Sequence, residues 1–275
     1  MQHIRLVIAD VDGTLVNDHR ELSSYTKKTI ERLHEEGILF GVASGRDYVQ
    51  LLEDNEYWGF DFPFDVTIGM NGGQVYIAET KQLYEYNKLS TDTVKDIVCM
   101  MEPLDLNPFV YGPDHTMICK RIDKATEDSG ERNSMIFHVV KDISEFWSKP
   151  IPKIMYRTTK EQMPEVYQWA KEHPSENYQA FKTQTTMLEF QDPHIHKGIG
   201  LQHAVNLLNI DMKDVLAFGD MSNDNPMLLA AGTGVCLKNG AQDTKDCADY
   251  ITDYTNNEDG LARFIHKYIF KKSEE

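Results

Sequence analysis

The chain has 275 residues, of which 41% are hydrophobic and 26% are charged, and it is long enough to bury the core of one large domain or two modest ones. Its 28 lysines and arginines face 44 aspartates and glutamates, a net charge of −16, which argues against sequence-independent binding to nucleic acid or to an anionic membrane. No signal-peptide pattern opens the sequence, and no uncharged apolar run reaches the ~20 residues that span a bilayer. We therefore expect a soluble, cytoplasmic protein without nucleic-acid or membrane partners.

Strand and helix patterns alternate at both ends of the chain. Residues 4–9 form an apolar run typical of a buried strand, residues 23–36 have a helical pattern that stops at Gly37, and residues 38–44 predict a second strand. The alternation returns over residues 197–238. Because strands this apolar have no solvated face, this order predicts a parallel sheet covered by helices. We expect the two ends to form the halves of one α/β domain.

The middle of the chain has a different composition. Residues 88–187 contain two helical patterns and several short strand patterns, which favour a smaller α+β unit. This segment holds 13 lysines and arginines against 15 aspartates and glutamates, so it is the less anionic part of the chain. The predicted organisation is a core domain made of residues 1–87 and 188–275, with residues 88–187 inserted between its halves.

Two carboxylates, Asp10 and Asp12, follow the first strand pattern and precede Gly13 and Thr14. If the chain stays extended, both carboxylates project at the carboxyl end of the strand, which is the edge where open α/β sheets bind ligands. Gly13 permits a sharp turn there. Taken alone, Asp-Gly favours an ordinary surface turn. A calcium-binding loop is rejected because Leu15 stands where that loop needs glycine.

Four segments in chain order resemble the motifs of the haloacid dehalogenase superfamily. "DVDGTLVND" resembles its first motif, D-x-D-G-T, and "VASGR", "HKG" and "GDMSNDNPML" resemble the other three. One such match is weak, but four in order are specific. The position and size of the insert are similar to the type IIB cap of the Cof-like phosphatases. The resemblance implies an α/β fold with a Rossmann-like parallel-sheet core and an inserted α+β cap domain of type C2B.

The resemblance also implies a Mg²⁺-dependent phosphatase that forms an aspartyl-phosphate intermediate. Asp10 is then the nucleophile and Asp12 the general acid and base. Asp10, Asp220 and the backbone carbonyl of Asp12 are the implied magnesium ligands, in keeping with the preference of this hard cation for oxygen. The metal would offset the repulsion between an attacking carboxylate and a phosphate dianion.

The phosphate-binding residues are carried over in the same way. Ser44, the amide of Gly45 and Lys197 are expected to hold phosphate oxygens, Asn223 to donate to them, and Asp224 to orient Lys197 and the metal ligands. Taken singly, each has another interpretation: Ser44 as a helix cap, Lys197 as a solvated lysine, and Asp224 with its neighbours as caps of the next helix.

Two further residues follow predicted strands. Arg46 and Asn71 are expected to contact substrate in the same crevice, with ordinary loop structure as an equal alternative. The implied substrate is a small phosphorylated metabolite, above all a sugar phosphate. A phosphomutase of the same superfamily and a non-catalytic sugar-phosphate sensor are the competing functions.

Overall fold

The computed structural model describes residues 3–112, 115–132 and 135–270. The chain divides into two compact units, one made of Met1–Tyr86 with Ile195–Glu275 and the other of Asn87–His194. Within the described ranges, no helix is both long enough and apolar enough to cross a membrane.

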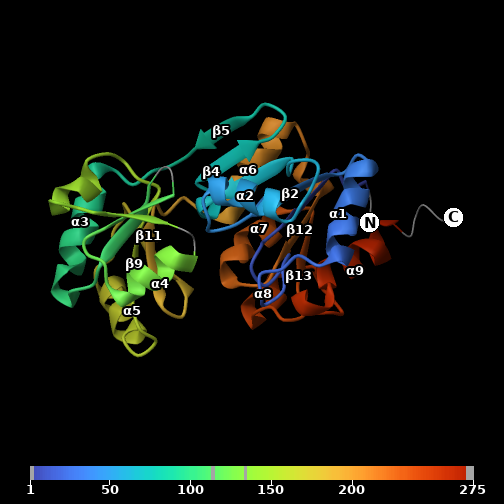
Figure 1. The fold of residues 1–275 in the computed structure, drawn as a ribbon. Helices are drawn as coiled ribbons and strands as arrows, with labels where there is room; N and C mark the ends of the chain where they lie inside the picture. The colour runs from blue at the N-terminus through green and yellow to red at the C-terminus, as the bar shows by residue number, and fades with distance from the viewer. Residues whose placement is uncertain (1–2, 113–114, 133–134, 271–275) are drawn as a thin grey trace. The chain divides into compact units, whose positions relative to one another are not determined.

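The first unit is built on an eight-stranded sheet (Figure 1). Its strand order is β14-β13-β12-β1-β2-β3-β4-β5. The six strands from β14 to β3 run parallel, and β4 and β5 continue the sheet as an antiparallel hairpin. The strands are β1 (Leu6–Ala9), β2 (Leu39–Ala43), β3 (Val66–Gly69), β4 (Gln74–Ile77), β5 (Gln82–Glu85), β12 (Val215–Gly219), β13 (Thr233–Cys236) and β14 (Tyr250–Ile251).

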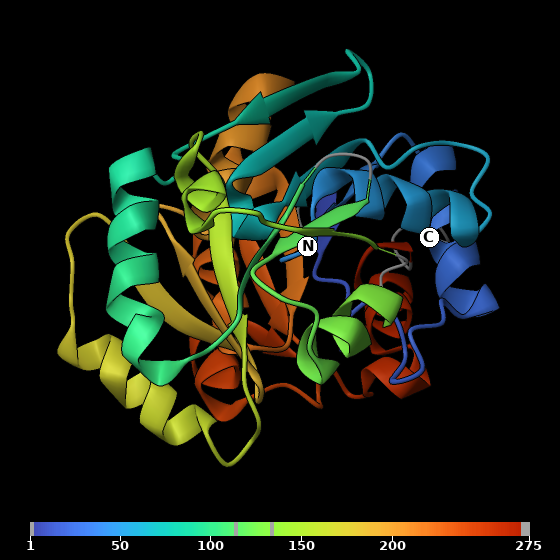
Figure 2. The same cartoon turned by 60° about the vertical axis from the view of Figure 1, so that its left-hand side comes forward.

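Helices cover both faces of this sheet (Figures 1 and 2). Side chains of α1 (Ser24–Glu35) and α9 (Gly260–Tyr268) belong to one hydrophobic layer, and those of α6 (Lys197–Leu208) and α7 (Asn225–Ala230) to the other. In β1, Val7 points into the first layer and Ile8 into the second. All four β1 residues are therefore buried, which explains the unbroken apolar run and confirms the expected parallel α/β core. The remaining helices are α2 (Tyr48–Tyr57) and α8 (Gln242–Cys247).

The second unit contains a six-stranded sheet of order β10-β11-β9-β6-β7-β8. Each neighbouring pair is antiparallel except β7 with β8. The strands are β6 (Pro108–Tyr111), β7 (Thr116–Cys119), β8 (Ile136–Val139), β9 (Lys153–Arg157), β10 (Gln179–Gln184) and β11 (Met187–Gln191), and the helices are α3 (Thr91–Met101), α4 (Lys124–Arg132) and α5 (Met163–Glu172). This is the expected α+β unit.

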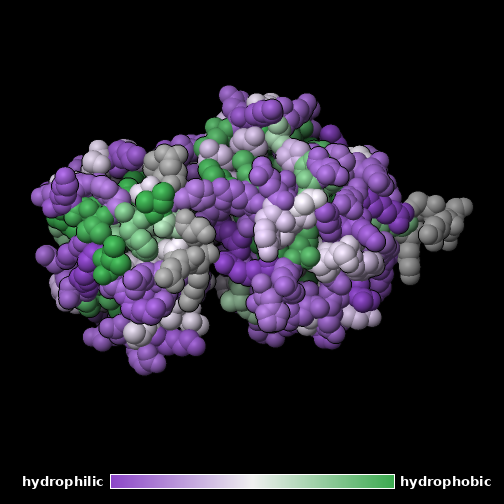
Figure 3. Space-filling view, viewed as in Figure 1, coloured by the Kyte–Doolittle hydropathy of each residue, from purple (hydrophilic) through white to green (hydrophobic). Residues whose placement is uncertain are grey.

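One face of the second sheet packs against α3 and α5, whose buried residues share a hydrophobic cluster with Tyr156 of β9. The surface of the unit also carries exposed apolar side chains, among them Ile122, Ile136 and Val139. Figure 3 shows hydrophobic patches on this unit.

The insert ends later than its predicted limit at residue 187. Strand β11, Met187–Gln191, pairs with β9 on one side and β10 on the other, so the second unit continues to His194. Because a short turn joins β10 to β11 and the two strands pair antiparallel, they belong to the same sheet.

Candidate active site

Asp10 follows β1 directly, and its backbone is tied to the neighbouring central strand. The Asp10 amide donates to the carbonyl of Phe218 in β12 at 2.9 Å. The Asp10 side chain is buried, with 8% of the residue exposed. The carboxylate therefore lies at the carboxyl end of the sheet centre, where α/β proteins bind ligands.

Gly13 and Thr14 fit this loop to the end of β12. Gly13 has a φ of +88°, and a Cβ at this position would lie 2.5 Å from Oδ2 of Asp220. Glycine is required on both counts, because a side chain would be strained and would displace the carboxylate. Thr14 donates its hydroxyl to Oδ1 of Asp220 at 2.9 Å. The motif thus positions a carboxylate more than two hundred residues away.

Lys197 is the first residue of α6 and is fully buried. Its ammonium contacts Oδ1 of Asp10 and lies 2.5 Å from Oδ1 of Asp224. Burial alone would lower the pKa of Lys197, but the two carboxylates raise it above its usual range. The alternative of a solvated lysine is therefore wrong.

Asp224 is also fully buried, and both of its oxygens are engaged. Oδ1 accepts from Lys197, while Oδ2 accepts from the amides of Asp220 and Met221 at 2.9 and 3.0 Å. Asp224 precedes α7, yet its carboxylate makes no cap hydrogen bond to that helix. It instead holds the loop after β12 against the lysine.

Asp10, Asp220 and Asp224 form the carboxylate cluster, in which one oxygen from each lies within 4.8 Å of the others. The Lys197 ammonium contacts Asp10 and Asp224, while Asp220 accepts from Thr14, so the cluster carries excess negative charge when all three carboxylates are ionised. Burial raises the pKa of Asp10 well above its usual range, and burial and then the charge of Asp224 raise the pKa of Asp220 to about 6. Hard oxygen ligands with uncompensated charge suit Mg²⁺. Both oxygens of Asp224 already accept hydrogen bonds, whereas among the residues that the structure describes Asp10 and Asp220 each accept side-chain hydrogen bonds at Oδ1 alone, so Asp10 and Asp220 are the carboxylates of the cluster that fit as ligands.

The Asp12 side chain lies outside the carboxylate cluster. It is about half exposed, at 49%, and its oxygens accept from Arg46 at 2.6 and 2.8 Å and from Arg20 at 3.4 Å. We expected Asp12 to share a face with Asp10 on an extended strand, but β1 ends at Ala9 and the chain turns from Val11. Alternation stops where the strand stops. The prediction that Asp10 and Asp12 share a face is therefore wrong, because the chain turns between them.

Arg46 joins the loops after β1 and β2. Besides its paired contacts with Asp12, its guanidinium donates to Oδ2 of Asp54 at 2.5 Å. The guanidinium of Arg46, which we expected to contact substrate, is therefore paired with two carboxylates at once. The sequence offered no signal for Asp54, which lies inside α2, or for the contact of Arg20 with Asp12.

Ser44, Gly45 and Asn71 are brought together by β2 and β3. The carbonyl of Ser44 accepts from the Asn71 amide at 2.9 Å, and a Cβ on Gly45 would lie 3.2 Å from Oδ1 of Asn71. Asn71 adopts φ 56° in the short η1 segment (Met70–Gly72). Asp47 provides the N-terminal cap of α2 by accepting from the Gln50 amide, so the interpretation of Ser44 as that cap is wrong.

Asn223 is exposed on η5 (Ser222–Asp224), immediately before the buried Asp224. Among the residues that the structure describes, no hydrogen bond links its side chain to the carboxylate cluster. The structure thus brings Asp10, Lys197, Asp220 and Asp224 into one network. Asp12 with Arg46, and Ser44 with Gly45 and Asn71, lie in neighbouring loops.

Carboxylates and a buried lysine lie together at the carboxyl ends of the central strands of a parallel α/β sheet. This arrangement has the parts that phosphoryl transfer requires. Comparison of the sequence with models of known families identifies the family. The sequence matches the model of the haloacid dehalogenase-like hydrolases over residues 7–265, and the chain belongs to that family.

Full-length relatives agree with this assignment. The chain is 26% identical over 267 residues to the Bacillus subtilis 5-amino-6-(5-phospho-D-ribitylamino)uracil phosphatase YitU, covering 96% of this chain and 97% of that protein. A haloacid dehalogenase-like hydrolase from Bacteroides thetaiotaomicron has a TM-score of 0.83 at 26% identity, covering 96% and 99% of the two chains. The subclass IIB sugar phosphatase BT4131 shares the fold, with a TM-score of 0.77 at 20% identity and coverage of 96% and 98%. The predicted family, fold class and phosphatase type of enzyme are confirmed.

Proposed function

We propose that the protein is a Mg²⁺-dependent phosphatase that hydrolyses a small phosphorylated metabolite, with sugar phosphates as the substrate class. The buried network of Asp10, Lys197 and Asp224 beside Asp220 carries this proposal. A sensor has no need for a buried carboxylate that a buried lysine contacts. BT4131 is named a sugar phosphatase, and YitU is named a 5-amino-6-(5-phospho-D-ribitylamino)uracil phosphatase. Both names support the proposal that the leaving group of this chain's substrate is polyhydroxylated.

Mg²⁺ would be held by Asp10, Asp220 and the backbone carbonyl of Asp12. When bound, it supplies positive charge that neutralises the phosphate group and the attacking carboxylate. Thr14 and Gly13 fix the Asp220 carboxylate for this purpose, one by its hydrogen bond and the other by the space it leaves.

Asp10 is the proposed nucleophile. Its Oδ1 is fixed by Lys197, which leaves Oδ2 to attack phosphorus as the bond from phosphorus to the ester oxygen breaks. Lys197 stays protonated and offsets the charge on the phosphoryl oxygens. Water then attacks phosphorus, which releases inorganic phosphate and restores the Asp10 carboxylate.

Asp12 is the proposed acid that protonates the leaving oxygen and the base that later activates water. In the structure its carboxylate is paired with Arg46. An arriving phosphate dianion offers Arg46 an alternative bidentate partner, so substrate binding would release Asp12 for proton transfer. Ser44, Gly45, Asn71 and Asn223 are the further proposed contacts to phosphate or leaving group.

A phosphate-release screen tests the proposal. The purified chain is assayed on sugar phosphates and on a ribityl-phosphate ester, with Mg²⁺ and with a chelator, beside Asp10→Asn as a matched control. We expect Mg²⁺-dependent release that Asp10→Asn abolishes. A strict need for a bisphosphate activator without net phosphate release would instead identify a phosphomutase. Saturable binding of sugar phosphates without turnover would identify a sensor.

A further inference from the structure

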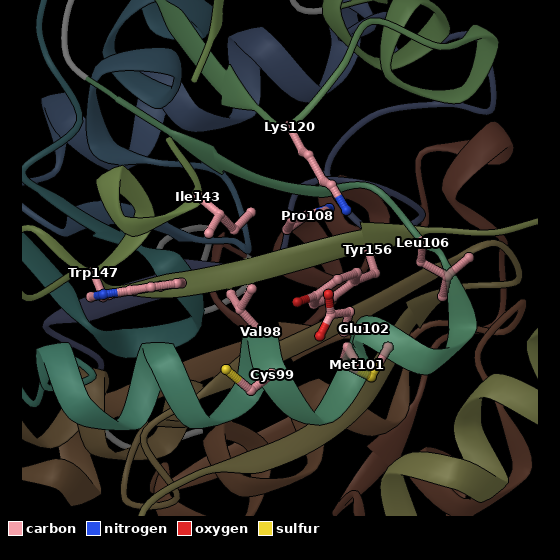
Figure 4. A pocket seen from close by; sticks show the side chains of 10 residues that line it. All are labelled: Val98, Cys99, Met101, Glu102, Leu106, Pro108, Lys120, Ile143, Trp147 and Tyr156. Atoms are coloured by element: carbon pink, nitrogen blue, oxygen red, sulfur yellow. The ribbon is translucent and has the colours of Figure 1, made fainter. Parts of the chain in front are cut away.

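Two features of the molecule have no part in the proposed reaction, a small pocket and a half-buried acidic residue. The pocket lies in the second unit, where α3 and the short η3 segment (Ile143–Trp147) meet the sheet, and its walls include Leu106 and Trp147 (Figure 4). Its volume of about 80 Å³ is roughly half of a ~150 Å³ cavity that holds benzene, so it is too small for a metabolite. The acidic residue is Asp54 of the first unit.

Asp54 is unfavourable for the helix that contains it. It lies in the last turn of α2, where negative charge opposes the helix dipole, and aspartate has a low propensity for helix interiors. Only 24% of its side chain is exposed. Burial raises the pKa of the Asp54 carboxyl, and the guanidinium of Arg46 opposes that shift. A residue that conflicts with its local structure in this way commonly serves a function.

Arg46 compensates for this conflict. Its Nη1 donates to Oδ2 of Asp54 at 2.5 Å, and Arg46 is the one hydrogen-bond partner of the Asp54 side chain among the residues that the structure describes. Nη2 of Arg46 donates to both oxygens of Asp12. The two carboxylates therefore hold the guanidinium at different nitrogens, and 16% of the Arg46 side chain is exposed.

The backbone of Arg46 is fixed as well. Its amide donates to Oγ of Ser44 at 3.3 Å, and its carbonyl accepts from the amide of Met70 at 2.7 Å. These bonds do not restrain the long side chain, so its carboxylate partners decide where the guanidinium lies. In the proposed reaction an arriving phosphate dianion draws Arg46 away from Asp12. Asp54 is then the carboxylate that still holds it.

We propose that Asp54 is the positioning residue of Arg46. It holds Nη1 while other N–H groups of the guanidinium pass from Asp12 to a phosphoryl oxygen. Arg46 thus meets the phosphate already oriented and loses little side-chain freedom on binding. This inference rests on the proposed phosphatase function. Removal of a negative charge beside the phosphate site should by electrostatics alone tighten phosphate binding, whereas loss of positioning should weaken it.

Calorimetric titration of the full-length chain with inorganic phosphate in the presence of Mg²⁺ tests the inference, together with KM for the best substrate of the release screen. Asp54→Asn should bind phosphate about 10-fold more weakly, a difference of about 1.4 kcal/mol. KM should rise by a similar factor, with kcat changed by less than about 3-fold. Glu56→Gln is the matched control, because Glu56 lies on the same helix but is exposed, and its phosphate affinity should equal that of the wild type. Equal or tighter phosphate binding by Asp54→Asn would overturn the inference.

A double-mutant cycle separates positioning from a structural role of Asp54 in α2. Arg46→Ala removes the guanidinium, so adding Asp54→Asn should weaken phosphate binding no further. A structural role would weaken binding by the same factor with and without Arg46, and that result would contradict positioning. A wild type that neither binds phosphate nor releases it from esters would overturn the proposed function and the inference with it. A wild type that does both, with Asp54→Asn behaving alike, would overturn the inference alone.

Discussion

Replacing Asp224 by asparagine should destabilise the first unit although the two side chains have nearly the same shape. Asparagine has one acceptor oxygen and one donor group. In one orientation the side-chain oxygen of asparagine faces Lys197, and its NH₂ group then meets the backbone N–H donors of Asp220 and Met221. In the other orientation the oxygen faces those donors, and the NH₂ group meets the Lys197 ammonium. Two hydrogen bonds to a charged acceptor are worth about 1.5–3 kcal/mol each. Relief of repulsion with Asp10 and Asp220 offsets part of this loss, and we expect unfolding free energy to fall by about 3 kcal/mol.

The measurement follows Trp58, the tryptophan of the first unit, by ¹⁹F NMR of protein labelled with 5-fluorotryptophan. Trp58 packs near Phe64, with ring centroids 6.1 Å apart, and its signal reports unfolding of the first unit in urea. Asn223→Ala is the matched control, because Asn223 is next to Asp224 in the chain but is exposed. The unfolding free energy of this variant should stay within about 0.5 kcal/mol of that of the wild type. An equally small change for Asp224→Asn would refute the view that both of its oxygens are needed.

Four further predictions follow from the site. Asp12→Asn should lower kcat by roughly 10²- to 10⁴-fold on esters with poor leaving groups and less on good ones; equal losses on both, measured by steady-state kinetics, would contradict its role as acid. Gly13→Ala should weaken Mg²⁺ by about 10-fold or more in calorimetry, since its Cβ would meet Asp220 at 2.5 Å; unchanged affinity would count against this packing. The pKa of Asp220 is raised to about 6 in the folded protein, so protonation of Asp220 stabilises the metal-free fold at low pH, and this stability declines as pH rises from about 4 to about 6. Mg²⁺ affinity should rise over the same pH range, because the ionised carboxylate is the ligand; an affinity that does not depend on pH would be inconsistent with that titration. Exchanging Asn87–His194 for the insert of a relative should reorder kcat/KM among sugar phosphates and keep the Mg²⁺ requirement, whereas an unchanged ranking in a folded chimera would place specificity in the core loops.

Local patterns predicted the core better than the edges of the fold. The apolar run of β1 implied a strand buried on both faces, and its residues do alternate between two hydrophobic layers. The insert boundary was misplaced because no local pattern assigns the short strand β11 to either unit, and only its pairing with β9 and β10 places it in the second. Pairing between distant segments leaves no periodic signal in a short strand.

The site was predictable only where residue types form recognisable motifs. Asp10, Lys197 and Asp224 were expected to act together because of the family resemblance, not because of any local pattern, as they are far apart in the chain. The pairing of Asp12 with Arg46 could not be foreseen, since it depends on where β1 ends and how two loops approach. Side-chain direction in a turn is set by that tertiary approach.

The most direct test of the central claim is a rapid acid quench of the enzyme during turnover, followed by peptide mass spectrometry. Acyl phosphates survive acid, and the account predicts one phosphoryl group on the peptide that contains Asp10, removed by hydroxylamine and absent without Mg²⁺. Asp12→Asn should accumulate more of it when supplied with an ester of a good leaving group, because attack by water is then the slower step. Continued turnover with no phosphorylated peptide, or with phosphate on another residue, would contradict Asp10 as the nucleophile.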